Sequence, residues 1–150
     1  FRSAVPMSTP LDRSLTYRLH LLHKVSDALS HQTYLQNLGL SLSDARGLAT
    51  IGSFQPMSVV ALADKANLNK GQASRAAQIL VDKGWVTKHG HPSDGRGVAL
   101  SLTPQGQALW AQVMAEIEGR NQQIFGCLSP EEQATFSHWL DRLIAHNHKP

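Results

Sequence analysis

The chain has 150 residues, of which 41% are hydrophobic and 17% are charged, and its formal net charge at pH 7 is +3. This length suits one domain, or a small domain with helical extensions. The composition is that of a soluble globular protein, because a disordered chain would hold fewer apolar residues and more charge. The longest apolar run, residues 59–63, is far short of the ~20 residues that span a bilayer, so we expect no membrane partner.

The first residues are set apart from the fold. Residues 1–6 precede Met7 and lack the apolar stretch of a signal peptide. We therefore interpret residues 1–10 as a leader or an expression remnant and residues 11–150 as a single domain. The single cysteine, Cys127, excludes an intramolecular disulfide and fits the reducing cytoplasm, which is the expected location.

Positive charge is concentrated in residues 64–97. This segment holds six basic side chains against three acidic ones, whereas the rest of the chain holds eight of each. All the excess positive charge therefore lies in about a quarter of the chain, as expected of a surface that neutralises phosphates. An uneven but ordinary solvated surface is the alternative explanation of the charge alone.

Two helices are expected before residue 55. Apolar residues at helical spacing predict a long amphipathic helix over residues 11–38, which Gly39 ends. Ser43 is expected to cap a short helix that runs to about Ile51 and stops at Gly52.

A second pair of helices follows. Ser58 is a suitable cap for a helix over residues 59–65, and a polar turn at residues 67–69 leads into a helix over residues 70–83. Gly84 closes that helix. The core of the pair is predicted to contain Leu62, Ala63, Leu68, Ile79 and Leu80.

The pattern then changes from helical to alternating. Residues 85–89 and 98–102 alternate in the manner of strands, and the residues between them are rich in turn formers. Two short strands and their loop make a β-hairpin, and the helices before it complete a winged helix-turn-helix over residues 43–103.

Two helices are expected at the C-terminal end, over residues 104–147. Thr103 and Pro104 have the chemistry of a helix cap and a first helical position. Ser129 and Glu132 form a capping box that opens the last helix. The predicted fold is mostly α with a small β-hairpin wing, and its long N- and C-terminal helices lie outside the winged unit.

The order of these elements predicts contact with DNA. In a helix-turn-helix the second helix enters the major groove, where arginine bonds guanine, glutamine bonds adenine, and lysine and serine serve phosphates. A loop arginine can reach into the minor groove, and the alternative for Arg96 is a loop salt bridge with Asp94. The predicted DNA-binding residues are Ser58, Asn69, Lys70, Gln72, Ser74, Arg75, Gln78, Lys88 and Arg96.

Three segments carry a family resemblance. Leu62-Ala63 with residues 68–75, followed by residues 80–86, resembles the recognition unit of the multiple-antibiotic-resistance (MarR-type) regulators. Residues 91–96 with Leu102-Thr103 are similar to that family's wing signature, an aspartate and an arginine two apart and then leucine-threonine.

The resemblance covers nearly the whole chain, since such proteins also carry a long first helix and two long C-terminal helices that pair as a dimer. It implies that Arg75 and Arg96 contact DNA and that Asp94, also in the predicted DNA-binding set, orients an arginine. Gly95 departs from the pattern, because the family commonly has a second basic residue there. This departure predicts weaker binding of DNA by the wing.

The outer helices predict a homodimer. Their apolar stripes are too long for the small winged unit to cover, and the alternative is a monomeric bundle that closes on itself. A two-fold dimer predicts a pseudo-palindromic operator with half-sites roughly 34–36 Å apart. The residues expected to face the second subunit are Leu15, Leu19, Leu22, Leu140, Leu143 and Ile144.

The resemblance further implies an effector. Many relatives lose DNA affinity when small aromatic or phenolic anions bind between the dimer helices and the reading unit. Tyr17, Arg18, His20 and Trp110 are expected to line such a site, with ordinary core packing as the alternative for the aromatic residues.

Metal and redox sensing are alternatives with less support. His20 and His23 have a spacing that can serve a metal, but no cysteine or glutamate cluster completes a tetrahedral set, so no metal site and no cofactor is assigned. Cys127 has no adjacent basic residue, and we interpret it as a semi-buried structural cysteine.

Enzyme chemistry is not expected, because the chain contains no nucleophile elbow, phosphate loop or His-Glu-x-x-His pattern. A winged-helix module that binds protein is the alternative from another class. The prediction is a sequence-specific DNA-binding transcription regulator, a repressor, that binds an operator as a homodimer and is released by a small aromatic ligand.

Overall fold

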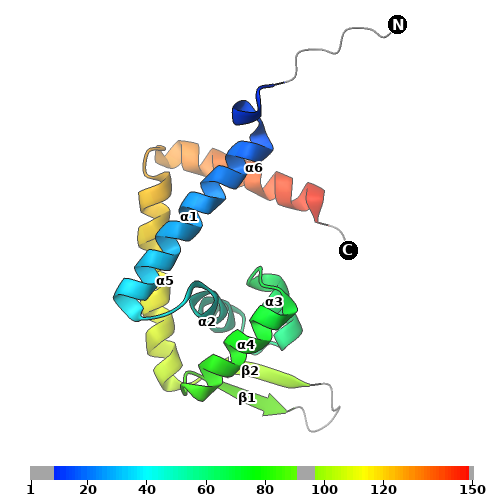
Figure 1. Cartoon of the computed structure of the whole chain (residues 1–150), viewed down its shortest axis with the longest axis vertical. Helices are drawn as coiled ribbons and strands as arrows, with labels where there is room; N and C mark the ends of the chain where they lie inside the picture. The colour runs from blue at the N-terminus through cyan, green and yellow to red at the C-terminus, as the bar shows by residue number, and fades with distance from the viewer. Residues whose placement is uncertain (1–8, 91–96, 149–150) are drawn as a thin grey trace, which may run out of the picture. The chain divides into compact units, whose positions relative to one another are not determined.

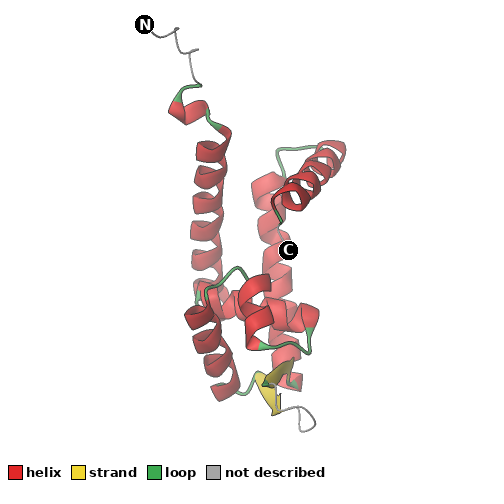
Figure 2. Ribbon diagram, turned by 90° about the vertical axis from the view of Figure 1, so that its right-hand side faces the viewer, coloured by secondary structure: helices red, strands yellow, loops and turns green. Residues whose placement is uncertain are grey.

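The computed structural model describes residues 9–90 and 97–148 (Figures 1 and 2). The chain divides into two compact units, Phe1–Glu116 and Ile117–Pro150. The described elements are the 3-10 helix η1 (Leu11–Arg13), the helices α1 (Leu15–Leu38), α2 (Leu42–Phe54), α3 (Val59–Lys65), α4 (Lys70–Asp82), α5 (Pro104–Phe125) and α6 (Pro130–Asn147), and the strands β1 (Val86–Gly90) and β2 (Val98–Leu102). The predicted fold class is confirmed, and the single domain over residues 11–150 stays a prediction.

The start of α1 differs from its prediction. Ser14 has extended backbone, with φ −65° and ψ 138°, and it separates η1 from α1, so the expected helix over residues 11–38 is interrupted there. The predicted end is confirmed, since Gly39 closes α1 in the left-handed conformation with φ 66°.

The bounds of α2 were also predicted wrongly. Its cap is Ser41, whose hydroxyl accepts from the Asp44 N–H at 3.1 Å, and not Ser43. Gly52 does not stop the helix, which continues to Phe54. A Cβ at Gly52 would collide with the indole of Trp110, so the glycine lets α5 approach α2.

The hairpin is antiparallel and pairs Val86 with Leu102 and Gly90 with Val98. β1 begins one residue later than predicted. Met57, between α2 and α3, exchanges two backbone hydrogen bonds with Leu100 of β2, at 2.7 and 3.2 Å. These bonds attach the hairpin to the helices, and the sequence pattern did not indicate them.

The core of the first unit lies between α2, α3, α4 and β2, where Leu48, Ile51 and Leu100 are fully buried. Of the predicted core residues, Leu62, Leu68 and Leu80 are buried and Ala63 is half-buried. Ile79 is exposed, and its prediction was wrong. The inward face of α4 repeats every three or four residues and consists of Ala73, Ala76, Ala77 and Leu80, so Ile79 falls on its flank.

The second unit is the end of α5 and α6. The rings of Phe125 and Phe136 lie 5.7 Å apart, and the Gln133 side-chain amide donates to the carbonyls of Phe125 and Leu128, each at 3.1 Å. The capping box predicted at Ser129 and Glu132 is confirmed. In the part of the chain that the structure describes, no helix is both long and apolar enough to cross a membrane.

Candidate nucleic-acid interface

The turn between α3 and α4 sets the direction of α4. Asn67 has φ 56°, a left-handed conformation that asparagine tolerates better than most residues. The Leu68 N–H donates to the Ala63 carbonyl at 3.0 Å, and the next residue, Asn69, caps α4. Figure 1 shows α3, α4 and the hairpin gathered at one end of the first unit.

α4 has an apolar face and a polar face. Small alanines line the buried side, and the Leu80 side chain reaches Gly47 of α2, where an added Cβ would lie 3.4 Å from it. Lys70, Ser74 and Arg75 are exposed on the opposite side. The guanidinium of Arg75 lies over Gly71, one turn toward the start of the helix. This polar face, residues 70, 71, 74, 75 and 78, is the surface available to a ligand.

Three of the predicted DNA-binding residues take part in capping. The Asn69 side chain accepts from the Gln72 N–H at 2.8 Å, and the Gln72 side chain accepts from the Asn69 N–H at 3.0 Å. This capping box holds both side chains against the backbone at the start of α4. Ser58 caps α3 in the same way, through the Ala61 N–H at 3.1 Å. All three residues remain at the end of a helix where anions are attracted.

Two other predicted residues bond to each other. The Lys88 ammonium of β1 donates to Gln78 Oε1 at 2.9 Å, and Gln78 Nε2 donates to Asp82 Oδ1 at 2.8 Å. Sequence reasoning missed Asp82, although its place four residues after Gln78 on one helix face was a usable signal. Asp94 and Arg96, predicted in the wing, lie outside the described residues.

The predicted ligand residues have different surroundings. Trp110 Nε1 donates to the Ala49 carbonyl at 3.2 Å, and the indole packs on Gly52, so Trp110 joins α5 to α2. Tyr17, Arg18 and His20 are exposed on the first turns of α1. A ligand site lined by these four residues stays a prediction.

The histidines and the cysteine are the candidates for metal or redox sensing. His23 Nε2 lies 3.3 Å from Asp27 Oδ2, and the same carboxylate pairs with Arg46 of α2 at 2.6 Å. Within residues 9–90 and 97–148, no group of three or more His, Cys, Asp or Glu side chains is placed to hold a metal ion. Cys127 is exposed in the turn after α5, so the prediction of a semi-buried cysteine was wrong.

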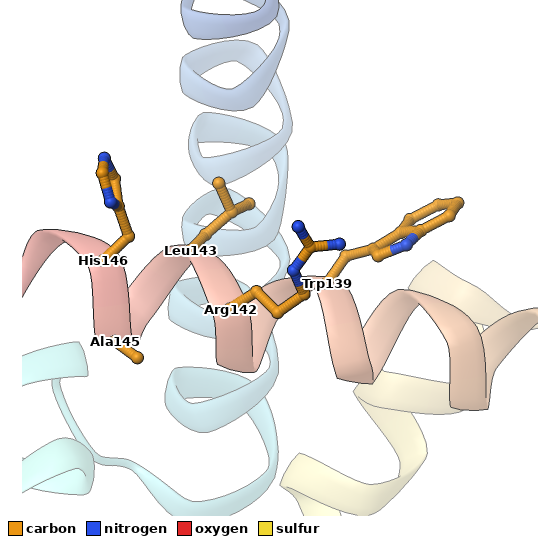
Figure 3. Close-up of a pocket in the computed structure, with 5 residues that line it drawn as sticks. All are labelled: Trp139, Arg142, Leu143, Ala145 and His146. Carbon is orange, nitrogen blue, oxygen red and sulfur yellow. The ribbon is translucent and has the colours of Figure 1, made fainter.

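The second unit carries a shallow depression on α6 (Figure 3). Trp139, Arg142, Leu143, Ala145 and His146 line it, and its volume is about 760 Å³. Trp139, Leu143 and His146 stand on successive turns of one helix face, and α6 has no buried residue. This face is therefore apolar, aromatic and cationic, with much of its apolar surface in contact with solvent.

Comparisons with known proteins agree with this geometry. A family model described as MarR family matches residues 40–98. The chain is 27% identical over 127 residues to the multiple antibiotic resistance protein MarR of Escherichia coli, with 84% of this chain and 88% of the relative covered. It is 25% identical over 126 residues to an HTH-type transcriptional repressor of Mycobacterium tuberculosis, with 83% and 91% covered.

Solved structures match nearly the whole chain. A MarR family regulator from Silicibacter pomeroyi has a TM-score of 0.82 at 22% identity and covers 94% of both chains, a likeness that shows the fold. A mutant of E. coli MarR complexed with operator DNA has a TM-score of 0.76 at 26% identity, covering 91% of this chain and 99% of that one.

Proposed function

Because this chain is a MarR-type winged helix-turn-helix protein, a DNA-binding transcription regulator and not an enzyme, we propose that it represses transcription by binding a pseudo-palindromic operator as a homodimer. The observation that carries the proposal is the polar face of α4. Lys70, Ser74 and Arg75 are exposed there, opposite the buried alanines. The helix is thus held by one side and offers the other to a major groove.

Binding to DNA is tested by selection and then by titration. Duplexes selected from random DNA are expected to share a two-fold motif, and the affinity for them falls linearly on a logarithmic salt scale as counterions are released. Arg75→Ala weakens binding, whereas Lys24→Ala, which removes an exposed positive charge from α1, serves as the control. Binding that does not respond to salt would instead favour a protein partner.

The dimer is supported by apolar surface on the outer helices. Leu15 is 79% exposed, Leu19 60% and Ile144 63%, which is a large apolar area for a single chain to leave in water. Leu22 and Leu143 are exposed as well, and Leu140 is half-buried. Burial of these side chains against a second copy would set the distance between two α4 helices.

The assembly is tested by the mass of the particle in solution. Leu143→Glu, in the depression of Figure 3, is expected to give a folded monomer with weakened operator binding. His138→Glu adds the same charge at an exposed position of α6 and is the matched control. A wild-type chain that is monomeric at micromolar concentration, with the operator bound, would contradict the homodimer.

Repression and release by a ligand belong to the same proposal. Repression is supported by the name of the M. tuberculosis relative. A small aromatic or phenolic anion that binds one conformation of the dimer more tightly would shift its population away from DNA. A melting screen against phenolic acids and divalent metals tests this, because a ligand that binds only the folded state raises the melting temperature.

A further inference from the structure

Gln78, Lys88 and Asp82 form a connected set of side chains that joins α4 to the hairpin. Gln78 follows Ser74 and Arg75 on the polar face of α4, and Asp82 follows it by one more turn. Lys88 comes from β1, where it lies opposite Leu100 in the hairpin register.

We propose that Gln78 reads a base and that Lys88 and Asp82 hold its amide in one orientation, which makes Lys88 a positioning residue and not a phosphate contact. The inference deepens the proposed function, on which it rests. It assigns sequence preference at one operator position to a contact between the wing strand and the recognition helix.

The chemistry of the two neighbours prevents the amide from turning over. An ammonium group only donates hydrogen bonds and a carboxylate only accepts them. Gln78 Oε1 faces the Lys88 ammonium at 2.9 Å, and Nε2 faces the Asp82 carboxylate at 2.8 Å. Rotation of the amide by half a turn would place its NH₂ group against the ammonium and its oxygen against the carboxylate, and both hydrogen bonds would be lost.

The held amide keeps the two groups that adenine needs. A glutamine amide has two N–H donors and two acceptor lone pairs, of which one donor and one lone pair are used here. One donor and one lone pair remain, and adenine presents an acceptor and a donor in the major groove. Because the side chain is ordered before DNA arrives, less entropy is lost on binding.

The hairpin register directs Lys88 toward α4. Residues directly opposite in an antiparallel pair share a face, so Lys88 lies on the same face as the buried Leu100, and Val86 lies there too by alternation. The lysine stem can cover this apolar face while its ammonium reaches Gln78. Leu100 is in turn bonded to Met57, which fixes the strand against the helices.

The charges of these three side chains also argue against a contact between Lys88 and a DNA phosphate. The Asp82 carboxylate shares Gln78 with the Lys88 ammonium, so one negative charge accompanies the positive one. Lys70, which is exposed on the first turn of α4, is the lysine with which Lys88 can be compared. Lys70 is expected to release a counterion from DNA, and Lys88 is not.

The test measures binding of the full chain to a selected operator and to duplexes that change each base pair of one half-site. Lys88→Met and Gln78→Ala are expected to lose discrimination at the same base pair, about fivefold or more each. The double variant is expected to lose no more than either single one, because both act through one amide. Lys88→Arg, which keeps a cationic donor, is expected to restore the preference.

Salt dependence separates positioning from phosphate binding. Lys88→Met is expected to keep the wild-type salt slope, and Lys70→Met to reduce it by about one. The inference would be overturned if Lys88→Met lost affinity equally for all duplexes and its salt slope fell by about one, as expected for Lys70→Met. An unchanged base preference in Gln78→Ala would also overturn it. Circular dichroism of each variant confirms the fold. A folded wild-type chain that selects no operator would overturn the proposed function instead.

Discussion

The guanidinium of Arg75 lies over Gly71, where a Cβ at residue 71 would come within 3.2 Å of its Nη1 nitrogen. The arginine thus extends along α4 toward the N-terminus, the direction that helical side chains favour. Both residues are on the polar face of the helix, near the end where its dipole is positive. This relationship makes substitution at either position a test of the proposed DNA surface.

Arg75→Ala removes the guanidinium from this surface. A lost base contact should weaken operator binding by about 1–3 kcal/mol and relax the preference for one base pair. Fluorescence anisotropy with the selected operator and its variants measures both. If neither the affinity nor the base preference changes, α4 is not the helix that contacts the operator bases.

Gly71→Ala keeps Arg75 but adds a methyl group 3.2 Å from its resting Nη1 nitrogen, so the guanidinium has to shift by a few tenths of an ångström. The helix should be as stable as before or more so, because alanine favours helix over glycine by about 1 kcal/mol. Operator affinity should nevertheless fall, because the new methyl group displaces the guanidinium. Thermal melting and anisotropy on the same samples separate the two effects. An unchanged affinity would show that the resting position of Arg75 does not matter for binding.

Gly52→Ala tests the packing of α5 on α2. The added Cβ would meet the Trp110 indole, which is held by its bond to the Ala49 carbonyl, so the indole cannot simply turn aside. We expect a loss of about 1–3 kcal/mol in the free energy of unfolding, measured with urea. Gly119→Ala is the matched control, since a Cβ there meets nothing within 4 Å. Equal stability of the two variants would contradict this packing.

Arg96→Ala tests the wing, whose tip lies outside the described residues. If this arginine reaches the minor groove, its loss should weaken operator binding and make the salt slope shallower by about one. Titrations at several salt concentrations measure the slope. Wild-type affinity and slope in this variant would refute the wing assignment.

Local chemistry was enough to predict several elements. The bounds of α3 were predicted at Val59 and Lys65, because Ser58 has the side chain of a cap and the apolar residues follow at once. The capping box at Ser129 was predicted for the same reason. Ser41 and Ser43 have the same capping chemistry two residues apart, so composition alone could not choose between them.

Other features depend on contacts between distant segments. Glycine commonly ends helices, so Gly52 was expected to end α2. Only the approach of Trp110, far along the chain, explains why a glycine lies inside this helix. The hydrogen bond between Lys88 and Gln78 was also not predicted, while their contact with DNA stays a prediction. Their bond depends on the hairpin register against α4, which no local pattern specifies.

The central claim is sequence-selective binding to DNA through α4, and one titration tests it most directly. The wild-type chain and Arg75→Ala are titrated against the selected operator and against a shuffled duplex of equal length and composition. We predict that the wild-type chain prefers the operator by at least about a thousandfold at physiological salt and that Arg75→Ala loses part of this preference. Equal affinity of the wild-type chain for both duplexes would contradict the claim.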